Sequence, residues 1–155
     1  MVSNNVTRLL DNRKISYKVY ELPKDKLGAE ETARLLDVPP EIVFKSIVIK
    51  RRGLGKPILA VIPGNKEVDL KALAKAIREK KVSPATQSEA ENLTRLQAGG
   101  ISPLALINRG FEIIIDRSAL DYDGIHVSGG ERGLTIWLAA ADLIQLTQGK
   151  TAQIC

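Results

Sequence analysis

The chain has 155 residues, 44% of them hydrophobic and 26% charged, with a net charge of +5, a composition that excludes an intrinsically disordered chain and predicts one compact domain over residues 1–155. Every apolar run is shorter than the roughly 20 residues that cross a bilayer and the N-terminal residues are polar, so we expect a cytoplasmic protein without membrane contact. The single cysteine, Cys155, and the single histidine, His126, exclude an internal disulfide and a metal site built on thiolates or histidines.

The first third of the chain predicts a helix, a strand and a second helix. In SNNVTRLLDNRK (3–14) either Ser3 or Asn4 is a candidate N-cap, and apolar residues follow at helical spacing. SYKVYEL (16–22) alternates as a strand does. LGAEETARLLDV (27–38) predicts a helix that ends before two prolines.

Two apolar runs rich in β-branched residues follow, FKSIVIK (44–50) and ILAVIP (58–63). The link RRGLGKP between them contains two glycines, so the three segments predict an antiparallel hairpin of central strands. Asp69 is placed to cap a helix over 70–77, whose apolar residues recur at i, i+3, i+4 and i+7.

Positive charge is concentrated in this part of the chain. Residues 45–81 contain eleven Lys and Arg and three acidic residues, a net charge of +8, so the rest of the chain carries −3. With only 4% aromatic residues, such a segment suits a partner with phosphates that is bound through its backbone charge. A solvated, lysine-rich helix face explains the charge equally well.

The second half of the chain adds short elements around a glycine-rich loop. The segments 82–85, 111–116, 124–128 and 134–138 predict strands, and the segments 86–94 and 139–147 predict helices. SGGERG (128–133) predicts a tight turn between the last two strands. Hairpins dominate and no βαβ repeat is present, so we predict an α+β domain with a mixed, mostly antiparallel sheet.

Lys45 is the first candidate for chemistry. It stands between Phe44 and Ser46 at the start of an otherwise apolar strand, where an ammonium group is costly unless it reaches a sheet edge, a carboxylate or a ligand. Either Lys45 extends to the edge of the sheet, or it holds a phosphate or polarises a carbonyl group.

The loop GGISP (99–103) is the second candidate. Glycines allow backbone amides to approach a ligand closely and to converge on one oxygen, and Pro103 fixes where the loop ends. The loop is therefore either a tight turn or an oxyanion site. The same alternatives apply to SGGERG, in which Ser128 offers a hydroxyl group at the end of a strand.

Motifs of other catalytic classes are missing, including HExxH, the P-loop and GxGxxG after a strand. An enzyme with this sequence is therefore expected to work without a metal, a cofactor or a histidine base. His126 alternates with Ile125 and Val127 in a strand, so we expect it to face outward and to be structural. We expect Trp137 to lie in the core and Cys155, the last residue, to take no part in catalysis.

Taken together and in order, five segments resemble the YbaK family of aminoacyl-tRNA deacylases, which is similar to the editing domain inserted in bacterial prolyl-tRNA synthetases. The segments are VFKSIVI, AVIPGNKEVDLKALAKAI, GGISPLAL, IIID and HVSGGERGLTIWLAAADL. The lysine that begins a strand and the GGISP loop about fifty residues later form the most specific pair. The resemblance extends from the first helix to Leu146.

The resemblance implies a free-standing trans-editing hydrolase, independent of metal, that cleaves the ester of a mischarged aminoacyl-tRNA, most often cysteinyl-tRNA for proline. It implies a mixed, barrel-like sheet flanked by helices. A cysteinyl substrate would use its own thiol as the attacking group and other amino acids would need water, a choice that the sequence leaves open. Prolyl-tRNA synthetase is a candidate partner. The alternative function is a module that binds RNA or an aminoacyl or nucleotide group without cleaving it.

The resemblance and the basic segment together give a set of site residues. The expected catalytic residues are Lys45, Gly99, Gly100, Ile101, Ser102 and Pro103. The expected substrate-binding residues are Tyr20, Ser46, Ser128, Gly129, Gly130 and Thr135. The expected tRNA-binding residues are Lys50, Arg51, Arg52, Lys66 and Lys71.

Two positions depart from the family pattern. Members commonly have Thr-Gly-Tyr ahead of the loop, where this chain has Thr94, Arg95 and Leu96. Thr135 stands where close relatives can have an acidic residue that helps to bind the substrate's amino group. We expect these departures to affect the pocket mouth, the tRNA contact and the choice of amino acid more than the class of reaction.

Overall fold

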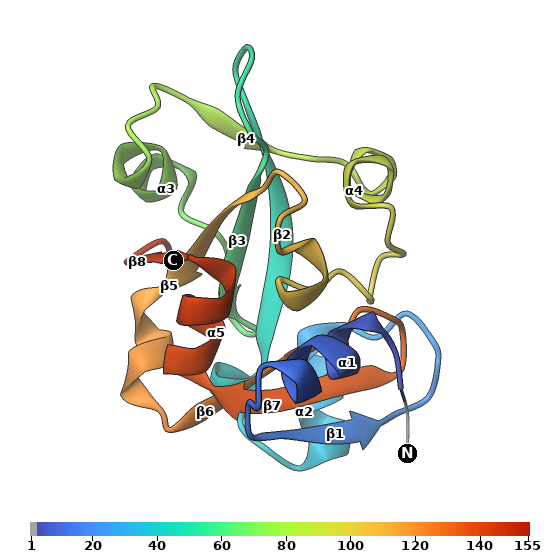
Figure 1. Cartoon of the computed structure of the whole chain (residues 1–155). Coiled ribbons are helices and arrows are strands. Elements are labelled where there is room, and N and C mark those ends of the chain that lie inside the picture. The colour runs from blue at the N-terminus through green and yellow to red at the C-terminus, as the bar shows by residue number, and fades with distance from the viewer. Residues whose placement is uncertain (1–2) are drawn as a thin grey trace.

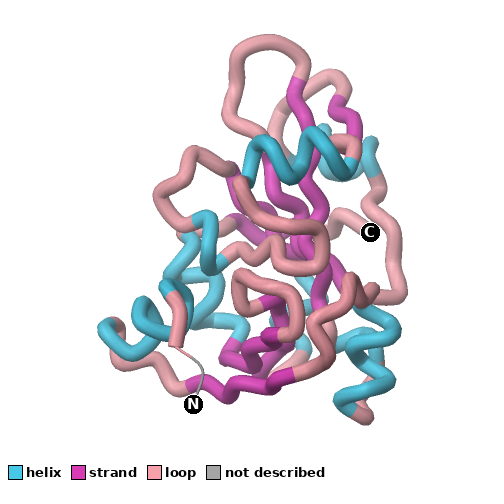
Figure 2. The backbone as a smooth tube through the Cα atoms, turned by 90° about the vertical axis from the view of Figure 1, so that its right-hand side faces the viewer, coloured by secondary structure: helices cyan, strands magenta, loops and turns pink. Residues whose placement is uncertain are grey.

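The structure, a computed structural model, describes residues 3–155. Many of its strand segments run through the middle of the molecule, with helices and loops around them (Figure 2). They form two sheets, one of three strands in the order β1-β7-β6 and one of five strands in the order β4-β2-β3-β5-β8. The smaller sheet lies across one end of the larger one (Figure 1).

The elements have the following bounds. The strands are β1 (Tyr17–Glu21), β2 (Phe44–Arg51), β3 (Ile58–Pro63), β4 (Val82–Pro84), β5 (Glu112–Asp116), β6 (Gly124–Ser128), β7 (Leu134–Ala139) and β8 (Lys150–Ala152). The α-helices are α1 (Asn5–Asn12), α2 (Ala29–Leu36), α3 (Leu70–Ala76), α4 (Gln87–Thr94) and α5 (Ala140–Thr147). Short 3₁₀ helices are η1 (Pro40–Ile42), η2 (Leu104–Leu106) and η3 (Arg117–Asp121).

The three-stranded sheet is antiparallel throughout, with β7 at its centre. Thr135 of β7 lies opposite Tyr20 of β1 on one side and opposite Ser128 of β6 on the other. Residues directly opposite one another project from the same face of a sheet. This register therefore places three of the expected substrate-binding residues in one row on one face.

The five-stranded sheet is mixed. The β2–β3 hairpin is antiparallel, and β4 adds to β2 in the same sense. In contrast, β5 is parallel to β3 and β8 is parallel to β5. All six residues of β3 are buried, as expected for the centre of a sheet. The tip of the hairpin projects beyond the rest of the molecule (Figures 1 and 2).

Two hydrophobic clusters cover the two faces of the five-stranded sheet. Phe44 and Val48 of β2 belong to the cluster that also contains apolar residues of β6 and β7, whereas Ile49 belongs to the cluster that includes α3. Successive side chains of a strand point to opposite faces. Ser46 therefore shares the face that looks toward the smaller sheet, and Lys45 starts from the opposite face.

Local capping signals are confirmed. The Asn4 side chain accepts a hydrogen bond from the Thr7 amide at the start of α1, and Asp69 accepts one from Ala72 at the start of α3. Such caps satisfy amide groups that a helix start leaves without partners. The predicted helix starts at these two places follow from this chemistry.

The predicted α+β class and the mixed sheet are confirmed. The description of the sheet as barrel-like is loose, because the strands of the described chain form two sheets and no closed barrel. The predicted strands and helices are all present, with bounds that differ by a few residues. Strand β8 was not expected. None of the helices in the described chain is long and apolar enough to span a membrane.

Candidate active site

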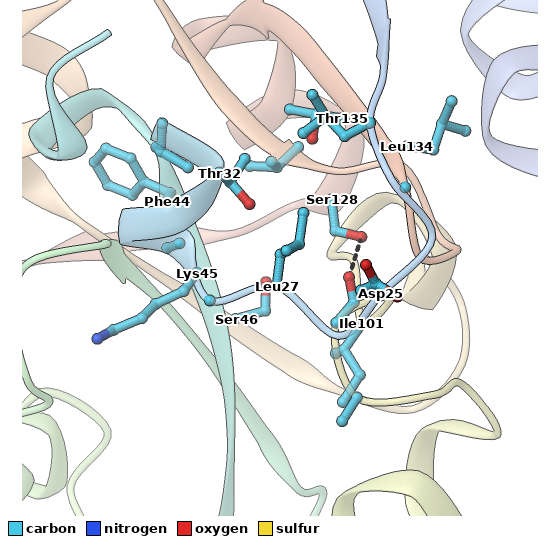
Figure 3. Close-up of a pocket in the computed structure, with 18 residues that line it drawn as sticks. Asp25, Leu27, Thr32, Phe44, Lys45, Ser46, Ile101, Ser128, Leu134 and Thr135 are labelled. Carbon is cyan, nitrogen blue, oxygen red and sulfur yellow. Dashed lines mark hydrogen bonds between the residues drawn. The ribbon is translucent and has the colours of Figure 1, made fainter. Parts of the chain in front are cut away.

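A cavity of about 260 Å³ lies where the start of β2, the glycine loop, the β6–β7 turn and the loop before α2 meet (Figure 3). Six of the expected site residues line it: Lys45, Ser46, Gly99, Ile101, Ser128 and Thr135. The fold therefore brings the lysine, the glycine loop and the second glycine turn to one place, although they are far apart in the sequence.

Lys45 lines the cavity, but its side chain extends away from Ser128 and Ile101 (Figure 3). Its Nζ donates a hydrogen bond of 3.2 Å to the carbonyl oxygen of Gly64, the residue after β3. The ammonium group therefore lies on the opposite side of the cavity from the glycine loop. One neutral carbonyl satisfies only one of its three N–H donors.

The five residues of the glycine loop divide into two groups. Gly100 donates its amide hydrogen to the carbonyl oxygen of Gln97 at 2.8 Å, which closes a turn. Ser102 and Pro103 are buried, and the Ser102 hydroxyl accepts a hydrogen bond from the Leu104 amide at 3.1 Å. These three residues shape the loop. Gly99 and Ile101 line the cavity.

Glycine is needed at residue 100 for steric reasons. A Cβ atom there would lie 2.9 Å from the Cα atom of Glu131, so the loop packs directly against the turn 128–133. The Arg132 side chain donates from Nε to the carbonyl oxygen of Ala98 at 2.7 Å. The two glycine-rich segments therefore form one wall of the cavity.

Two backbone amides of the loop are candidates for binding an oxygen atom. Within residues 3–155 the amide groups of Gly99 and Ile101 donate no hydrogen bond. Gly99 has a positive φ of +93°, a conformation that glycine adopts without strain. Amide groups at such a turn form a small electropositive site when no internal acceptor occupies them.

Three expected substrate-binding residues lie outside the cavity lining. Gly129 is buried and donates its amide hydrogen to the Leu134 carbonyl at 2.8 Å, and Gly130 has a positive φ of +95°. Both residues shape the turn. The ring centroid of Tyr20 lies 5.4 Å from that of His126, and Tyr20 is absent from the cavity lining.

The expectation that His126 faces outward is wrong. The residue is only 3% exposed, because its backbone pairs with Val43 just before β2 and the Tyr20 ring packs beside its own. Its Nδ1 atom has no hydrogen-bond partner among the described residues. Burial lowers the pKa of His126 to about 4, so the ring is neutral at pH 7. Trp137, expected in the core, is half-buried, with the Nζ of Lys18 5.4 Å from its ring centroid.

The expected tRNA-binding residues do not all gather on one surface. Lys50 forms an ion pair with Glu89 at 2.7 Å. Arg51 pairs with Glu79 at 2.8 Å and with Glu112, so its charge is already neutralised. Lys50, Arg51 and Arg52 line one groove together with Lys81. Lys66 and Lys71 are exposed elsewhere, Lys66 beside a second cavity and Lys71 on α3.

The groove and the cavity lie toward opposite ends of β2. Arg51 is six positions after Lys45 along this strand, which corresponds to about 20 Å at the usual rise of a strand. The basic hairpin is therefore not part of the cavity wall. The separation between the groove and the cavity suits a long ligand, one end of which enters the cavity.

Sequence reasoning missed the segment between β1 and α2. Asp25 and Leu27 from this segment line the cavity, together with Thr32 of α2 (Figure 3). Pro23 and Gly28 mark the segment as a loop, which was the available signal. Its position over the cavity depends on contacts with residues far away in the sequence.

Other groups with possible reactivity lie elsewhere. Cys155 borders a second cavity together with Asp116, and burial and the Asp116 carboxylate raise the pKa of its thiol to about 11. Such a thiol is a poor nucleophile at neutral pH. The described residues contain no cluster of three or more His, Cys, Asp or Glu that could hold a metal ion.

A family model described as "Aminoacyl-tRNA editing domain" matches residues 24–146. A protein from Enterococcus faecalis, named "Putative Cys-tRNA(Pro)/Cys-tRNA(Cys) deacylase EbsC", is 38% identical over 152 residues, which cover 97% of this chain and 92% of that protein. A proline–tRNA ligase from Streptococcus equi is 26% identical over 132 residues, which cover 79% of this chain and 21% of the ligase.

Solved structures share the fold. A crystal structure of a hypothetical protein matches with a TM-score of 0.89 at 22% identity and covers 97% of this chain and 99% of that one. A structure described as "a putative trans-editing enzyme for prolyl tRNA synthetase" matches with a TM-score of 0.80 at 23% identity and covers 99% and 98% of the two chains.

Proposed function

Since the chain belongs to the aminoacyl-tRNA editing domain family, we propose that it is a free-standing trans-editing enzyme that hydrolyses the ester bond of mischarged aminoacyl-tRNA. The observation that carries this proposal is the cavity that joins residue 45, the glycine loop and Ser128 inside the matched range. We also propose that residues 1–155 form one editing domain, because the match extends over 92% of the relative from E. faecalis.

We propose cysteinyl-tRNA for proline as the main substrate. The name of the E. faecalis relative supports cysteine as the amino acid. The similarity to a segment of the proline–tRNA ligase supports a tRNA that this type of synthetase charges. It is also consistent with prolyl-tRNA synthetase as a partner that supplies the mischarged substrate.

The chemistry needs few protein groups. An aminoacyl ester is already activated, so orientation and stabilisation of the oxyanion account for much of the rate. The free amides of Gly99 and Ile101 would bind the carbonyl oxygen as negative charge develops on it. One oxyanion donor contributes about 10²- to 10³-fold to a rate, so two donors in a cavity are a substantial contribution.

Lys45 is assigned to the nucleotide end of the substrate. Its ammonium group lies away from the glycine loop and is bound by one neutral carbonyl group, so an incoming phosphate can displace or share this contact. The Ser128 hydroxyl lies beside the loop and is assigned to the aminoacyl end. The attacking group is a water molecule or, for a cysteinyl substrate, the thiol of the substrate itself.

The two attacking groups give different first products. When water attacks, the products are the free amino acid and the 3′-terminal hydroxyl of tRNA. When the substrate thiol attacks, the sulfur forms a bond to the carbonyl carbon, the ester oxygen leaves with the thiol proton, and the first product is a cyclic thioester. The neutral His126 lies outside the cavity lining and has no role in either route.

The basic hairpin is assigned to the tRNA backbone. Arg52 is exposed in the groove that Lys50, Arg51 and Lys81 also line, and phosphates bind such surfaces through charge. Because the groove lies about 20 Å from Lys45 along β2, the acceptor stem would lie at the hairpin while the single-stranded 3′ end reaches the cavity. Lys66 and Lys71 would contribute only long-range attraction.

The proposal is tested with purified protein and four substrates, cysteinyl-, alanyl-, seryl- and prolyl-tRNA for proline. We expect release of the amino acid from at least one mischarged tRNA, fastest for cysteine, and little release of proline. Mass spectrometry of the first product separates free cysteine from the cyclic thioester. Hydrolysis of all four substrates at the rate measured without protein would refute the proposed function.

A further inference from the structure

The cavity contains one acidic side chain that neither the motifs nor the proposed mechanism uses. Asp25 is the acidic residue among the described residues that line the cavity. In Figure 3 Asp25 and Ser128 lie on one side of the cavity, whereas the Lys45 side chain extends on the other. The acidic side chain and the ammonium group are therefore on different sides of the site.

The loop that carries Asp25 is held on both sides. The Leu22 amide donates to the Gly133 carbonyl oxygen at 2.8 Å, and the Lys26 ammonium group donates to the side-chain oxygen of Gln87 at 2.5 Å. A Cβ atom at Gly133 would lie 2.7 Å from the carbonyl oxygen of Leu22. Residues before and after Asp25 are thus fixed to the β6–β7 turn and to α4.

The same loop also contacts the glycine loop. A Cβ atom at Gly99 would lie 3.7 Å from the Cα atom of Lys26, which is ordinary van der Waals contact. Asp25 is the neighbour of Lys26 in the chain. Asp25 and Gly99, one of the two residues with an unused amide, therefore line the same cavity.

The Asp25 carboxylate has no protein partner among residues 3–155, either in an ion pair or in a hydrogen bond. Other exposed acidic residues, such as Glu30, also have no partner among the described residues, and Asp25 differs from them because it lines the cavity. A carboxylate in a cavity wall without a partner is available to a cationic group of a ligand, and charge-assisted hydrogen bonds are the strong ones.

We propose that Asp25 binds the α-ammonium group of the aminoacyl end and so places the ester carbonyl at the amides of Gly99 and Ile101. This inference rests on the proposed function. In every aminoacyl ester the ammonium group is attached to the carbon next to the carbonyl carbon. A group that fixes the ammonium therefore also fixes the orientation of the carbonyl, whichever amino acid is attached.

Recognition of the ammonium group by Asp25 would also affect which substrates are accepted. An ester with an acylated α-amino group has no positive charge there, and its amide hydrogen is a weaker donor to a carboxylate. Asp25 would then select aminoacyl esters with a free amino group and reject N-acylated ones, a class that includes peptidyl-tRNA. The enzyme would act before a peptide bond is formed.

The test compares wild type and Asp25→Asn on cysteinyl-tRNA and N-acetyl-cysteinyl-tRNA for proline. For wild type we expect kcat/KM to be about 10- to 100-fold higher with the free amine, the range of one charge-assisted hydrogen bond. Asp25→Asn should lose most of this difference by slowing hydrolysis of the free amine, with the N-acetyl substrate unchanged. Asp25→Glu should restore part of the preference.

Glu30→Gln is the matched control, because Glu30 is an exposed acidic residue in the first turn of α2 and lies outside the cavity lining. It should keep the wild-type preference. If Asp25→Asn is folded by circular dichroism and keeps that preference too, the role of Asp25 is refuted while the proposed function stands. If wild type hydrolyses neither substrate, the proposed function fails and the inference fails with it. If Asp25→Asn does not fold, the same comparison is made with Asp25→Ser.

Discussion

The hydroxyl group of Ser128 donates a hydrogen bond of 3.4 Å to the carbonyl oxygen of Gly99 (Figure 3), and this contact joins the end of β6 to the glycine loop. The amide of Gly130 donates in turn to the Ser128 oxygen at 3.4 Å. The second glycine turn thus supports the first. Because the amide donors are held before a substrate arrives, little reorganisation is needed when negative charge develops on the ester.

Replacement of Lys45 by Ala should abolish most of the hydrolysis and leave the fold intact. The ammonium group makes a single hydrogen bond, to the Gly64 carbonyl, so the folded state loses little. If Lys45 holds the nucleotide end, kcat/KM for cysteinyl-tRNA should fall about 100-fold or more.

The matched control for this substitution is Lys75→Ala, which removes the same charge from an exposed position near the end of α3. Turnover is measured as released amino acid, and folding as the thermal midpoint. Equal activities of the Lys45 and Lys75 variants would contradict the assignment.

Gly100→Ala should destabilise the protein by steric conflict. The new Cβ atom would lie 2.9 Å from Cα of Glu131 and 3.1 Å from its carbonyl carbon, and backbone atoms cannot move aside as a flexible side chain can. We expect the free energy of unfolding in urea to fall by about 1–3 kcal/mol. Hydrolysis should also fall, because the loop must move away from the β6–β7 turn.

Gly110→Ala separates steric conflict from backbone strain. Gly110 has a positive φ of +82°, and a Cβ atom added there would meet no other atom within 4 Å. The substitution therefore costs only the strain of a left-handed residue, about 1 kcal/mol. It should leave hydrolysis unchanged. Full activity and stability in the Gly100 variant would show that the loop does not need glycine there.

The elements of the fold were predictable where their signals are local. Asn4 and Asp69 cap helices by bonds within three residues, and the β2–β3 hairpin follows from two apolar runs and a glycine link. Strand β8 was not predictable, because its three residues become a strand only by pairing with β5. The division into two sheets likewise depends on contacts between distant segments, and the family resemblance suggested a barrel-like sheet instead.

In the candidate site, too, residues with a local sequence signal were predictable, and residues placed by distant contacts were not. The resemblance predicts Lys45, the glycine loop and Ser128 as site residues, and Lys45, Gly99, Ile101 and Ser128 line one cavity. Asp25 was missed because contacts with Gly133 and Gly99 bring its loop there. The alternation around His126 identified two faces of a strand, but it did not indicate that both faces are covered. Periodicity predicts faces, and only tertiary contacts decide burial.

Buried His126 should make stability depend on pH. Its pKa is lowered from 6.5 to about 4 by burial, so the unfolded chain takes up the proton first as the pH falls. The contribution of the neutral ring is fully present above pH 6.5 and is lost between 6.5 and 4. From pH 8 to pH 5 we expect the free energy of unfolding in urea to fall by about 2 kcal/mol.

His126→Gln provides the comparison for the pH series, because glutamine does not titrate. The carboxylates change little between pH 8 and 5, so the difference between the two proteins isolates the histidine. The variant can be less stable at every pH, yet its curve should be flatter than that of wild type. Parallel curves would show that His126 keeps an ordinary pKa in the folded protein.

Arg51 and Arg52 are neighbours in the chain, but we expect Arg51 to contribute to stability and Arg52 to contribute to tRNA binding. The guanidinium of Arg51 pairs with Glu79 at 2.8 Å and with Glu112, and its Nε donates to the Lys56 carbonyl at 2.7 Å. Arg51→Ala leaves two carboxylates without this partner in partly buried positions, so the free energy of unfolding in urea should fall by about 1–3 kcal/mol. An Arg51 variant as stable as wild type would show that these ion pairs are not structural.

Arg52 is exposed, so Arg52→Ala should change the free energy of unfolding by less than about 0.5 kcal/mol. In contrast, it should weaken the binding of tRNA for proline in fluorescence anisotropy titrations. The slope of log K against log salt should decrease by about 1, because one phosphate contact is lost. An unchanged salt slope in the Arg52 variant would remove the hairpin from the tRNA-binding surface, since Arg52 is the exposed arginine that the groove offers to a phosphate.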